Sequence, residues 1–344
     1  MARSTSQKLG VLILAAGKGT RMESEKPKVL HEVAGRPMLS YVIDSSKALR
    51  PEKMVVVVGH MADQVQAFYQ EDSDIEWALQ KELRGTGDAV RSAKKHFDDF
   101  EGDVLVLCGD TPGIRTETLH RLMMVHRTSS FDITLLTAEF DDPTGYGRII
   151  ASHDGSVKQI VEEKDASPQE KLIDEINTGI AVYRSSVLFD HLKKLKPLNK
   201  QKEFYLTDLV SITRAMGLTV GRMQIKDPTE VIGINDREAL AEAARVLYED
   251  YASKIMKAGV SLEDPTTIII EPQVHIGMDG VVQGDVSIRG QSRLGDGVKV
   301  MSGSQICDSV IGDQCKIGHG SIVSKVRLGQ GVIIGSHVVL GEEE

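Results

Sequence analysis

A repeat of six residues near the end of the sequence is the feature that most restricts the fold. From about residue 265, aliphatic side chains recur at every sixth position, and the phase slips by one residue twice. The thirteen positions are Ile270, Ile276, Val282, Ile288, Leu294, Val300, Ile306, Ile311, Ile317, Val323, Leu328, Ile334 and Leu340, and glycine directly follows seven of them. This hexapeptide pattern is typical of a parallel β-helix, in which each unit of six residues forms one side of a triangular coil.

Three sides make one coil, so the thirteen positions correspond to a little over four coils. A β-sandwich would instead require alternation with a period of two and turn residues at intervals of about 8 to 12 residues. We therefore predict a left-handed parallel β-helix of hexapeptide repeats over residues 261–344.

The first two thirds of the chain have a different pattern, in which short aliphatic runs alternate with amphipathic stretches. The aliphatic runs include GVLILAA, KMVVVVGH and GDVLVLCGD, and the amphipathic stretches include PMLSYVIDSSKAL and TETLHRLMMVHR. Fully apolar runs separated by helices indicate a mostly parallel sheet that is buried on both faces. We predict a Rossmann-like α/β domain over residues 1–235. Leucine, alanine, tyrosine and isoleucine at helical spacing then predict a linker helix within 236–260.

Charge and cysteine content exclude several classes of protein. The formal net charge is −9, which argues against nucleic acid or an anionic membrane as the main partner because both require extended basic surfaces. Cys108, Cys307 and Cys315 show no metal-ligand spacing and are too few for a disulfide scaffold. The apolar run after MARSTSQK is too short for a signal sequence or a membrane helix. We expect a cytoplasmic protein.

The stretch LGVLILAAGKGTRM, residues 9–22, has the composition of a phosphate-binding loop but matches neither common nucleotide motif. A Walker loop requires Ser or Thr after Gly-Lys, where this chain has Gly19, and a dinucleotide fingerprint requires glycine where it has Met22. The small residues still allow backbone N–H groups to approach an anion, and Arg21 and Lys28 add positive charge. The alternative is an ordinary turn between strand and helix with solvated basic residues.

The amino-acid sequence of this stretch, LAAGKGTRM followed by KPKVL, resembles that of the sugar nucleotidyltransferase family. Seven further segments occur in the order and approximate spacing of that family: LQKELRGTGDA, LCGDTP, DDPTGYGRI, VEEKDA, EINTGI, EFYLTD and GINDR. The resemblance covers residues 9 to about 325. It is closest to the N-acetylglucosamine-1-phosphate uridylyltransferases, whose bifunctional members also carry a C-terminal acetyltransferase domain.

The resemblance implies a nucleotide-diphospho-sugar transferase fold and displacement at phosphorus. An oxygen of N-acetylglucosamine 1-phosphate would attack the α-phosphorus of UTP, pyrophosphate would leave, and UDP-N-acetylglucosamine would form. Both reactants are polyanions, so Mg²⁺ and basic residues suit this reaction better than a proton-transfer pair. The implied catalytic residues are Arg21, Lys28 and Asp110, and the implied metal ligands are Asp110 and Asn235. Asp110 could instead cap a turn, and Asn235 could cap the linker helix.

The resemblance also divides the remaining site residues between the two substrates. The implied nucleotide-binding positions are Leu14, Ala15, Ala16, Gly17, Lys28, Gln80, Gly85 and Thr86. The implied sugar-binding positions are Cys108, Gly109, Gly147, Glu162, Asn177 and Asn235. Gln80 offers both a donor and an acceptor for the imide edge of uracil, although a surface glutamine is the alternative. Glu162 could belong to a solvated run of charges, and we assign Tyr205 and Thr207 to the cleft wall.

Two positions depart from the family pattern. Cys108 stands where the family usually has tyrosine, and Asp88 stands where it usually has histidine in Gly-Thr-Gly-His. Cys108 could be taken for a nucleophile, but the reaction needs no covalent step, so we expect it to pack in the core.

The β-helix is expected to assemble the protein as a homotrimer, because coils of this type commonly associate about a threefold axis. We find no counterpart of the later coils that bind acetyl-CoA in bifunctional relatives, so we expect a shortened β-helix without an acetyltransferase site. A related enzyme for another sugar or triphosphate and a non-catalytic sensing subunit remain alternatives. The presence of Arg21, Lys28, Asp110 and Asn235 together favours an enzyme.

Overall fold

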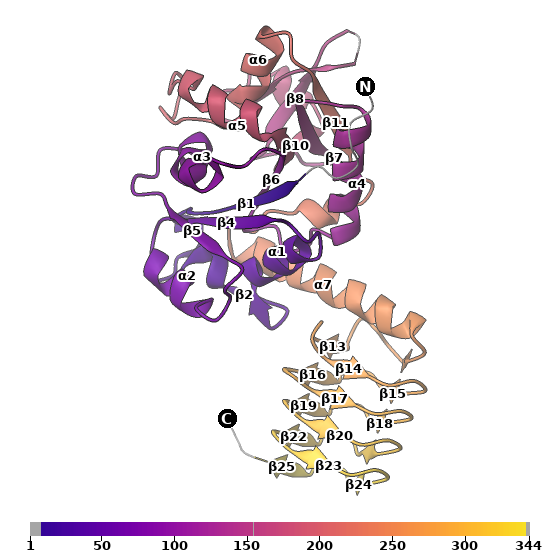
Figure 1. Cartoon of the computed structure of the whole chain (residues 1–344). Coiled ribbons are helices and arrows are strands. Elements are labelled where there is room, and N and C mark those ends of the chain that lie inside the picture. Colours follow the sequence, from indigo (N-terminus) through magenta and orange to yellow (C-terminus); the bar gives the residue numbers. More distant parts are fainter. Residues whose placement is uncertain (1–7, 154, 342–344) are drawn as a thin grey trace. The chain divides into compact units, whose positions relative to one another are not determined.

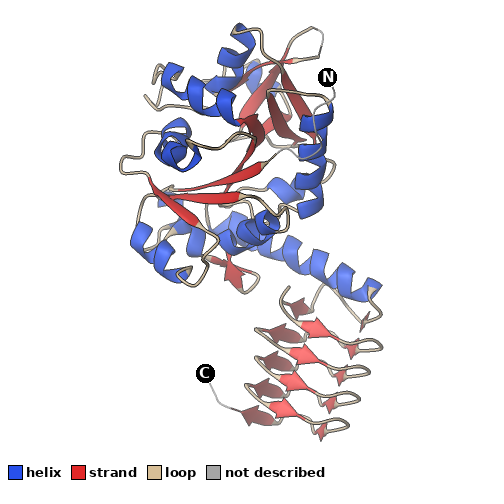
Figure 2. Ribbon diagram, viewed as in Figure 1, coloured by secondary structure: helices blue, strands red, loops and turns tan. Residues whose placement is uncertain are grey.

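The computed structural model describes residues 8–153 and 155–341. Contacts between residues divide the chain into two units. The first contains the residues up to His31 and Pro37–Ala239, and the second contains Glu32–Arg36 and the chain from Leu240 onward. Figures 1 and 2 show the elements of each unit. We retain the predicted boundaries at 235/236 and 260/261 as a proposal.

The first unit is built on one sheet with the strand order β11-β7-β10-β6-β1-β4-β5. Its strands are β1 (Leu9–Ala15), β4 (Lys53–Val58), β5 (Glu76–Leu79), β6 (Asp103–Cys108), β7 (Ile133–Glu139), β10 (Glu175–Arg184) and β11 (Val220–Gln224). Only β10 runs antiparallel to its neighbours along this described path. Two further strands, β8 (Gly147–Ala151) and β9 (Val157–Val161), extend from β10. The predicted mostly parallel sheet is confirmed.

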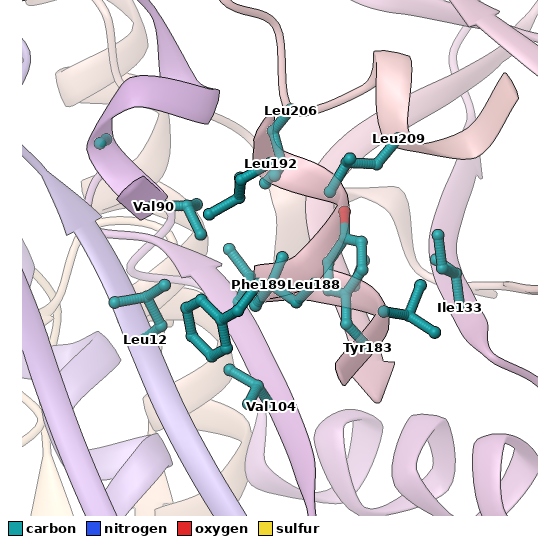
Figure 3. Packing of buried hydrophobic residues seen from close by; sticks show 14 of the residues in the cluster. Leu12, Val90, Val104, Ile133, Tyr183, Leu188, Phe189, Leu192, Leu206 and Leu209 are labelled. Atoms are coloured by element: carbon teal, nitrogen blue, oxygen red, sulfur yellow. The ribbon is translucent and has the colours of Figure 1, made fainter. Parts of the chain in front are cut away.

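Helices cover both faces of this sheet, which explains why its strands are apolar on both sides. The helices are α1 (Met38–Lys47), α2 (Ala62–Phe68), α3 (Thr86–Ala93), α4 (Thr116–Thr128), α5 (Ser185–His191) and α6 (Asp208–Ala215). Helices α3 and α5 lie on one face, and α1 and α4 lie on the other (Figure 1). Leu12 and Val104 of the sheet pack with Val90 of α3 and Leu188 of α5 in one buried cluster (Figure 3).

The second unit contains helix α7 (Arg237–Lys257), of which Leu240 onward belongs to it, and a stack of short parallel strands. Strands 12, 15, 18, 21 and 24 form one sheet, strands 13, 16, 19, 22 and 25 a second, and strands 14, 17, 20 and 23 a third. The bounds are β12 (Ser261–Leu262), β13 (Ile269–Ile270), β14 (His275–Ile276), β15 (Val281–Val282), β16 (Ser287–Arg289), β17 (Arg293–Leu294), β18 (Lys299–Val300), β19 (Gln305–Cys307), β20 (Val310–Ile311), β21 (Lys316–Ile317), β22 (Ile322–Ser324), β23 (Arg327–Leu328), β24 (Ile333–Ile334) and β25 (Val339–Gly341). Pairing with every third strand is the arrangement of the predicted β-helix, which is confirmed.

The strand register explains the two slips in the six-residue repeat. Ile288 pairs with Ile306, eighteen residues later, whereas Ile306 pairs with Val323, only seventeen residues later. One side of each later coil is therefore five residues long instead of six. The shorter side keeps the aliphatic side chains in line, since Ile288, Ile306 and Val323 are all buried.

We predict that truncating one inward-facing side chain of the β-helix is costly. Ile306 is 1% exposed, so Ile306→Ala should lower the free energy of unfolding by about 2–5 kcal/mol through lost apolar burial and a residual cavity. Denaturant unfolding followed by circular dichroism measures the loss, and hydrogen exchange of β16, β19 and β22 locates it. Gln305→Ala is the matched control because Gln305 is exposed. Equal effects of the two substitutions would contradict an inward position for Ile306.

Candidate active site

The candidate site lies at the carboxyl ends of neighbouring parallel strands, where clefts form in α/β sheets. The ends of β1, β5 and β6 meet a pocket of about 630 Å³. Nine of the predicted site residues line it: Leu14, Ala16, Gly17, Gln80, Gly85, Thr86, Cys108, Asp110 and Glu162. A cavity of about 210 Å³ shares Leu14, Thr86, Cys108 and Glu162 with this pocket and adds the predicted Gly147 and Asn177.

Five predicted residues do not line either space directly. Ala15 and Gly109 lie behind it, and the Gly109 N–H donates to the carbonyl of Leu14 over 2.9 Å. Lys28 contacts the lining residue Asp110, and Asn235 contacts Lys28 in turn. Arg21 is exposed in the short 3-10 helix Thr20–Met22.

Lys28 joins three segments that are far apart in the sequence. Its ammonium donates to Asp110 Oδ2 over 2.5 Å and to Asn235 Oδ1 over 2.8 Å. The lysine side chain is 9% exposed and that of Asp110 is 25% exposed. A backbone hydrogen bond of 2.9 Å from Ile234 to the Asp110 carbonyl holds the two oxygen-bearing segments together. The carboxylate and the amide oxygen therefore point at one cation.

Gly19 allows the opening loop to lie against Lys28. Its φ of 62° lies in the left-handed region, and a Cβ at this position would come within 2.6 Å of Lys28 Cβ. A Cβ at Gly17, in contrast, would meet nothing within 4 Å, so that part of the loop is open to a ligand. Gly19 is thus required by its backbone conformation and close packing, whereas Gly17 leaves space beside the loop.

Asp236 caps the linker helix, and Asn235 does not. Asp236 Oδ1 accepts a hydrogen bond of 2.9 Å from the backbone N–H of Ala239. Asn235 instead accepts from Lys28 and donates to the carbonyl of Gly233 over 3.3 Å. Its amide oxygen is thereby directed toward the Lys28 ammonium, which Asp110 also contacts.

The amide of Gln80 is held differently from the sequence expectation. Its nitrogen donates to the Gly85 carbonyl over 3.1 Å and to Asp88 Oδ2 over 3.3 Å. Both partners only accept, so they occupy both amide hydrogens. Gln80 therefore offers the pocket an acceptor alone, and the expected pairing of a donor with an acceptor is wrong in this structure.

Glu162 is the carboxylate at the junction of the two cavities. Its Oε1 accepts from the Thr207 hydroxyl over 2.8 Å, so Thr207 positions this carboxylate as well as forming the wall. Burial raises the pKa of Glu162, and the charges of Asp208, Asp165 and Glu203 add to the rise, while the Thr207 hydrogen bond opposes it. A partly buried carboxylate of this kind suits hydroxyl donors of a sugar.

Cys108 is a packing residue rather than an activated thiol. Burial raises its pKa to about 12, and the negative charge of Asp110 adds to the effect. A Cβ at Gly179 would come within 2.6 Å of the Cys108 sulfur, which shows how closely the backbone approaches it. A thiol with this pKa has almost no thiolate at neutral pH.

Sequence reasoning missed five residues that line the larger pocket: Lys18, Leu83, Ala89, Gln201 and Glu203. Lys18 and Glu203 lie inside segments that carried the resemblance, which was the available signal. Leu83 and Ala89 also lie inside such a segment, whereas Gln201 lies beside one, and its place depends on how the loops fold back.

Comparisons with known proteins match both parts of the chain. Residues 11–206 match the MobA-like NTP transferase domain, and residues 308–342 match the bacterial transferase hexapeptide repeat. The chain is 43% identical to a bifunctional protein GlmU of Pelobacter propionicus, over 96% of this chain and 72% of that protein. It is 44% identical to a bifunctional protein GlmU of Pelotomaculum thermopropionicum, over 96% of this chain and 76% of that protein.

The chain belongs to the GlmU family. Membership confirms the enzyme class predicted from the sequence, the sugar-1-phosphate uridylyltransferases that act on N-acetylglucosamine 1-phosphate. Members of this family supply precursors of the cell wall and depend generally on a metal ion, and their hexapeptide repeats indicate oligomerisation. Within the described residues, no helix is both long and apolar enough to cross a membrane.

The high pKa of Cys108 predicts slow alkylation. At pH 8 only about one thiol in ten thousand is ionised when the pKa is about 12, and this fraction rises about tenfold per pH unit. Iodoacetamide should therefore modify Cys108 far more slowly than N-acetylcysteine, as measured by mass spectrometry. Turnover of the Cys108→Ser variant should stay within about threefold of the wild-type value, since no covalent step is required. Rapid modification at pH 7 together with complete loss of turnover in the serine variant would contradict a packing role.

Proposed function

We propose that this site joins UTP to N-acetylglucosamine 1-phosphate, releasing pyrophosphate and forming UDP-N-acetylglucosamine, with Lys28, Asp110 and Asn235 at the reacting phosphates. One observation carries the proposal: at the carboxyl edge of the sheet, the Lys28 ammonium lies 2.5 Å from Asp110 Oδ2 and 2.8 Å from Asn235 Oδ1. Arg21, in the short 3-10 helix Thr20–Met22, is the second basic residue, after Lys28, that we assign to the triphosphate. Positive charge near transferring phosphates lowers the barrier because the reaction brings two polyanions together.

The metal that we propose is Mg²⁺, held by Asp110 and Asn235. A carboxylate and an amide oxygen are hard ligands, and both point at a position already occupied by a cation, the Lys28 ammonium. Among the described residues, His, Cys, Asp and Glu side chains form no cluster of three or more that could hold a metal by themselves. Two protein oxygens, completed by phosphate and water, are the usual coordination of Mg²⁺. When bound, the ion would neutralise phosphate charge and orient the phosphate oxygens.

The two cavities divide the substrates between them. Leu14, Ala16, Gly17, Gln80, Gly85 and Thr86 line the larger pocket, to which we assign the nucleotide, and Ala15 is the remaining loop residue that we assign to it. Gly147, Glu162 and Asn177 line the smaller cavity, to which we assign the sugar. Cys108, the last residue of β6, lines both spaces, and Gly109 follows it. Glu162 and Asn177 would hydrogen-bond sugar hydroxyls and the acetamido group. We place the reaction in the cytoplasm, in keeping with the absence of a disulfide among the cysteines that the structure describes.

Removing either proposed metal ligand should abolish most turnover. Asp110→Ala and Asn235→Ala should each lower kcat by about 10²–10³-fold, because a charge or ligand aimed at the reacting phosphates is lost. Pyrophosphate release from UTP and N-acetylglucosamine 1-phosphate, measured across Mg²⁺ concentrations, gives the effect. Asp236→Ala is the matched control, since the neighbouring carboxylate caps α7 and its loss should cost about 1 kcal/mol of stability without affecting the reaction. Unchanged turnover in Asp110→Ala would refute the assignment.

We also propose that the β-helix assembles three chains into a homotrimer. Ile322 and Val339 lie in register on one sheet and are 41% and 56% exposed, so this side presents apolar surface to solvent. Burial of one side of each triangle about a threefold axis would cover such a surface.

Light scattering at micromolar concentration should therefore report a trimer. Ile322→Glu should dissociate it, because a charge would replace the apolar contact at the interface. Lys299→Glu, an exposed change on another sheet, is the control that should leave the trimer intact. A monomer in the wild-type protein would contradict the proposal.

A further inference from the structure

Asp88 is a departure from the family pattern that the proposed chemistry leaves without a role. It lies in the first turn of α3, and its side chain is 6% exposed. A nearly buried carboxylate is costly unless it is paired and hydrogen-bonded. Its contacts should therefore show what it does.

The two oxygens of Asp88 have different partners. Oδ1 lies 3.0 Å from Arg84 and 3.5 Å from Arg91. Oδ2 accepts from the amide nitrogen of Gln80 over 3.3 Å. Two guanidinium groups thus hold the carboxylate in place while its other oxygen faces the glutamine.

The contact with Gln80 determines which end of the amide faces the pocket. An ionised carboxylate can only accept, so the amide nitrogen must face Asp88 and the Gly85 carbonyl. The oxygen Oε1 has no hydrogen-bond partner among the described residues, and Gln80 lines the larger pocket. The pocket is therefore given an acceptor, and rotation of the amide would place its one oxygen against two other acceptors, Asp88 Oδ2 and the Gly85 carbonyl.

We propose that Asp88 is a positioning residue for base selection, which locks Gln80 as an acceptor and thereby favours a pyrimidine with a ring N3–H over one with an unprotonated N3. This inference rests on the proposed nucleotide pocket. Uracil carries a hydrogen at N3 that pairs with Oε1, whereas cytosine presents a lone pair there. An acceptor facing another acceptor in a pocket leaves both unpaired, which is the strongest basis for rejecting an analogue.

The test compares UTP with CTP in Asp88→Asn and Asp88→Ala. Both variants remove the charged one of the two acceptors that hold the Gln80 nitrogen, so rotation of the amide to donate to N3 of cytosine costs less. The ratio of kcat/KM for UTP over CTP should fall at least tenfold, mainly through KM, while kcat at saturating UTP changes less than threefold. The ratio for dUTP over dTTP should stay constant in the same variants, because both bases carry N3–H.

A double substitution separates positioning from a purely structural role. In a Gln80→Ala background, Asp88→Asn should leave the UTP/CTP ratio unchanged, since there is no amide left to orient. An unchanged ratio in Asp88→Asn with native circular dichroism would overturn the inference. Absence of pyrophosphate release from UTP in the wild-type protein would instead overturn the proposed function, so the two failures are distinguishable.

Discussion

The ammonium of Lys28 is the contact on which the arrangement of the site depends. It lies between Asp110, at the end of a central strand, and Asn235, which comes from the last segment of the same unit. A mostly buried lysine is stable only beside compensating oxygens, so the three groups require one another. Gly19 lets the opening loop approach this lysine, which links that loop to the two proposed metal ligands.

The parallel strands of the sheet bring the loops of the site together. Strands β1, β5 and β6 are parallel, so the loops after all three open on the same edge. The loop after β1 brings small residues, that after β5 brings Gln80, and that after β6 brings Asp110. The strands therefore position both ends of one pocket, the end that we propose for the phosphates and the end that we propose for the base.

Local pattern predicted much of the fold. Short continuous apolar runs between amphipathic stretches indicate buried strands, and a six-residue aliphatic repeat indicates side chains that point inward in a coil, so both units followed from local pattern. The two phase slips had a local signal in the sequence, but their meaning, one shortened side per coil, required the register. The antiparallel course of β10 had no comparable signal, because strand direction depends on how distant segments pair.

The chemical groups of the site can be read directly from the chain: the small-residue loop, the carboxylate after a strand, and the departures at Cys108 and Asp88. Their hydrogen-bonding and protonation states depend on contacts between distant segments. Burial raises the pKa of Cys108 to about 12. Gln80 offers only an acceptor because Gly85 and Asp88 occupy both hydrogens of its amide nitrogen. Asp236 caps α7 and leaves Asn235 to face Lys28. Such properties arise from neighbours that the fold brings together, and sequence spacing does not record them.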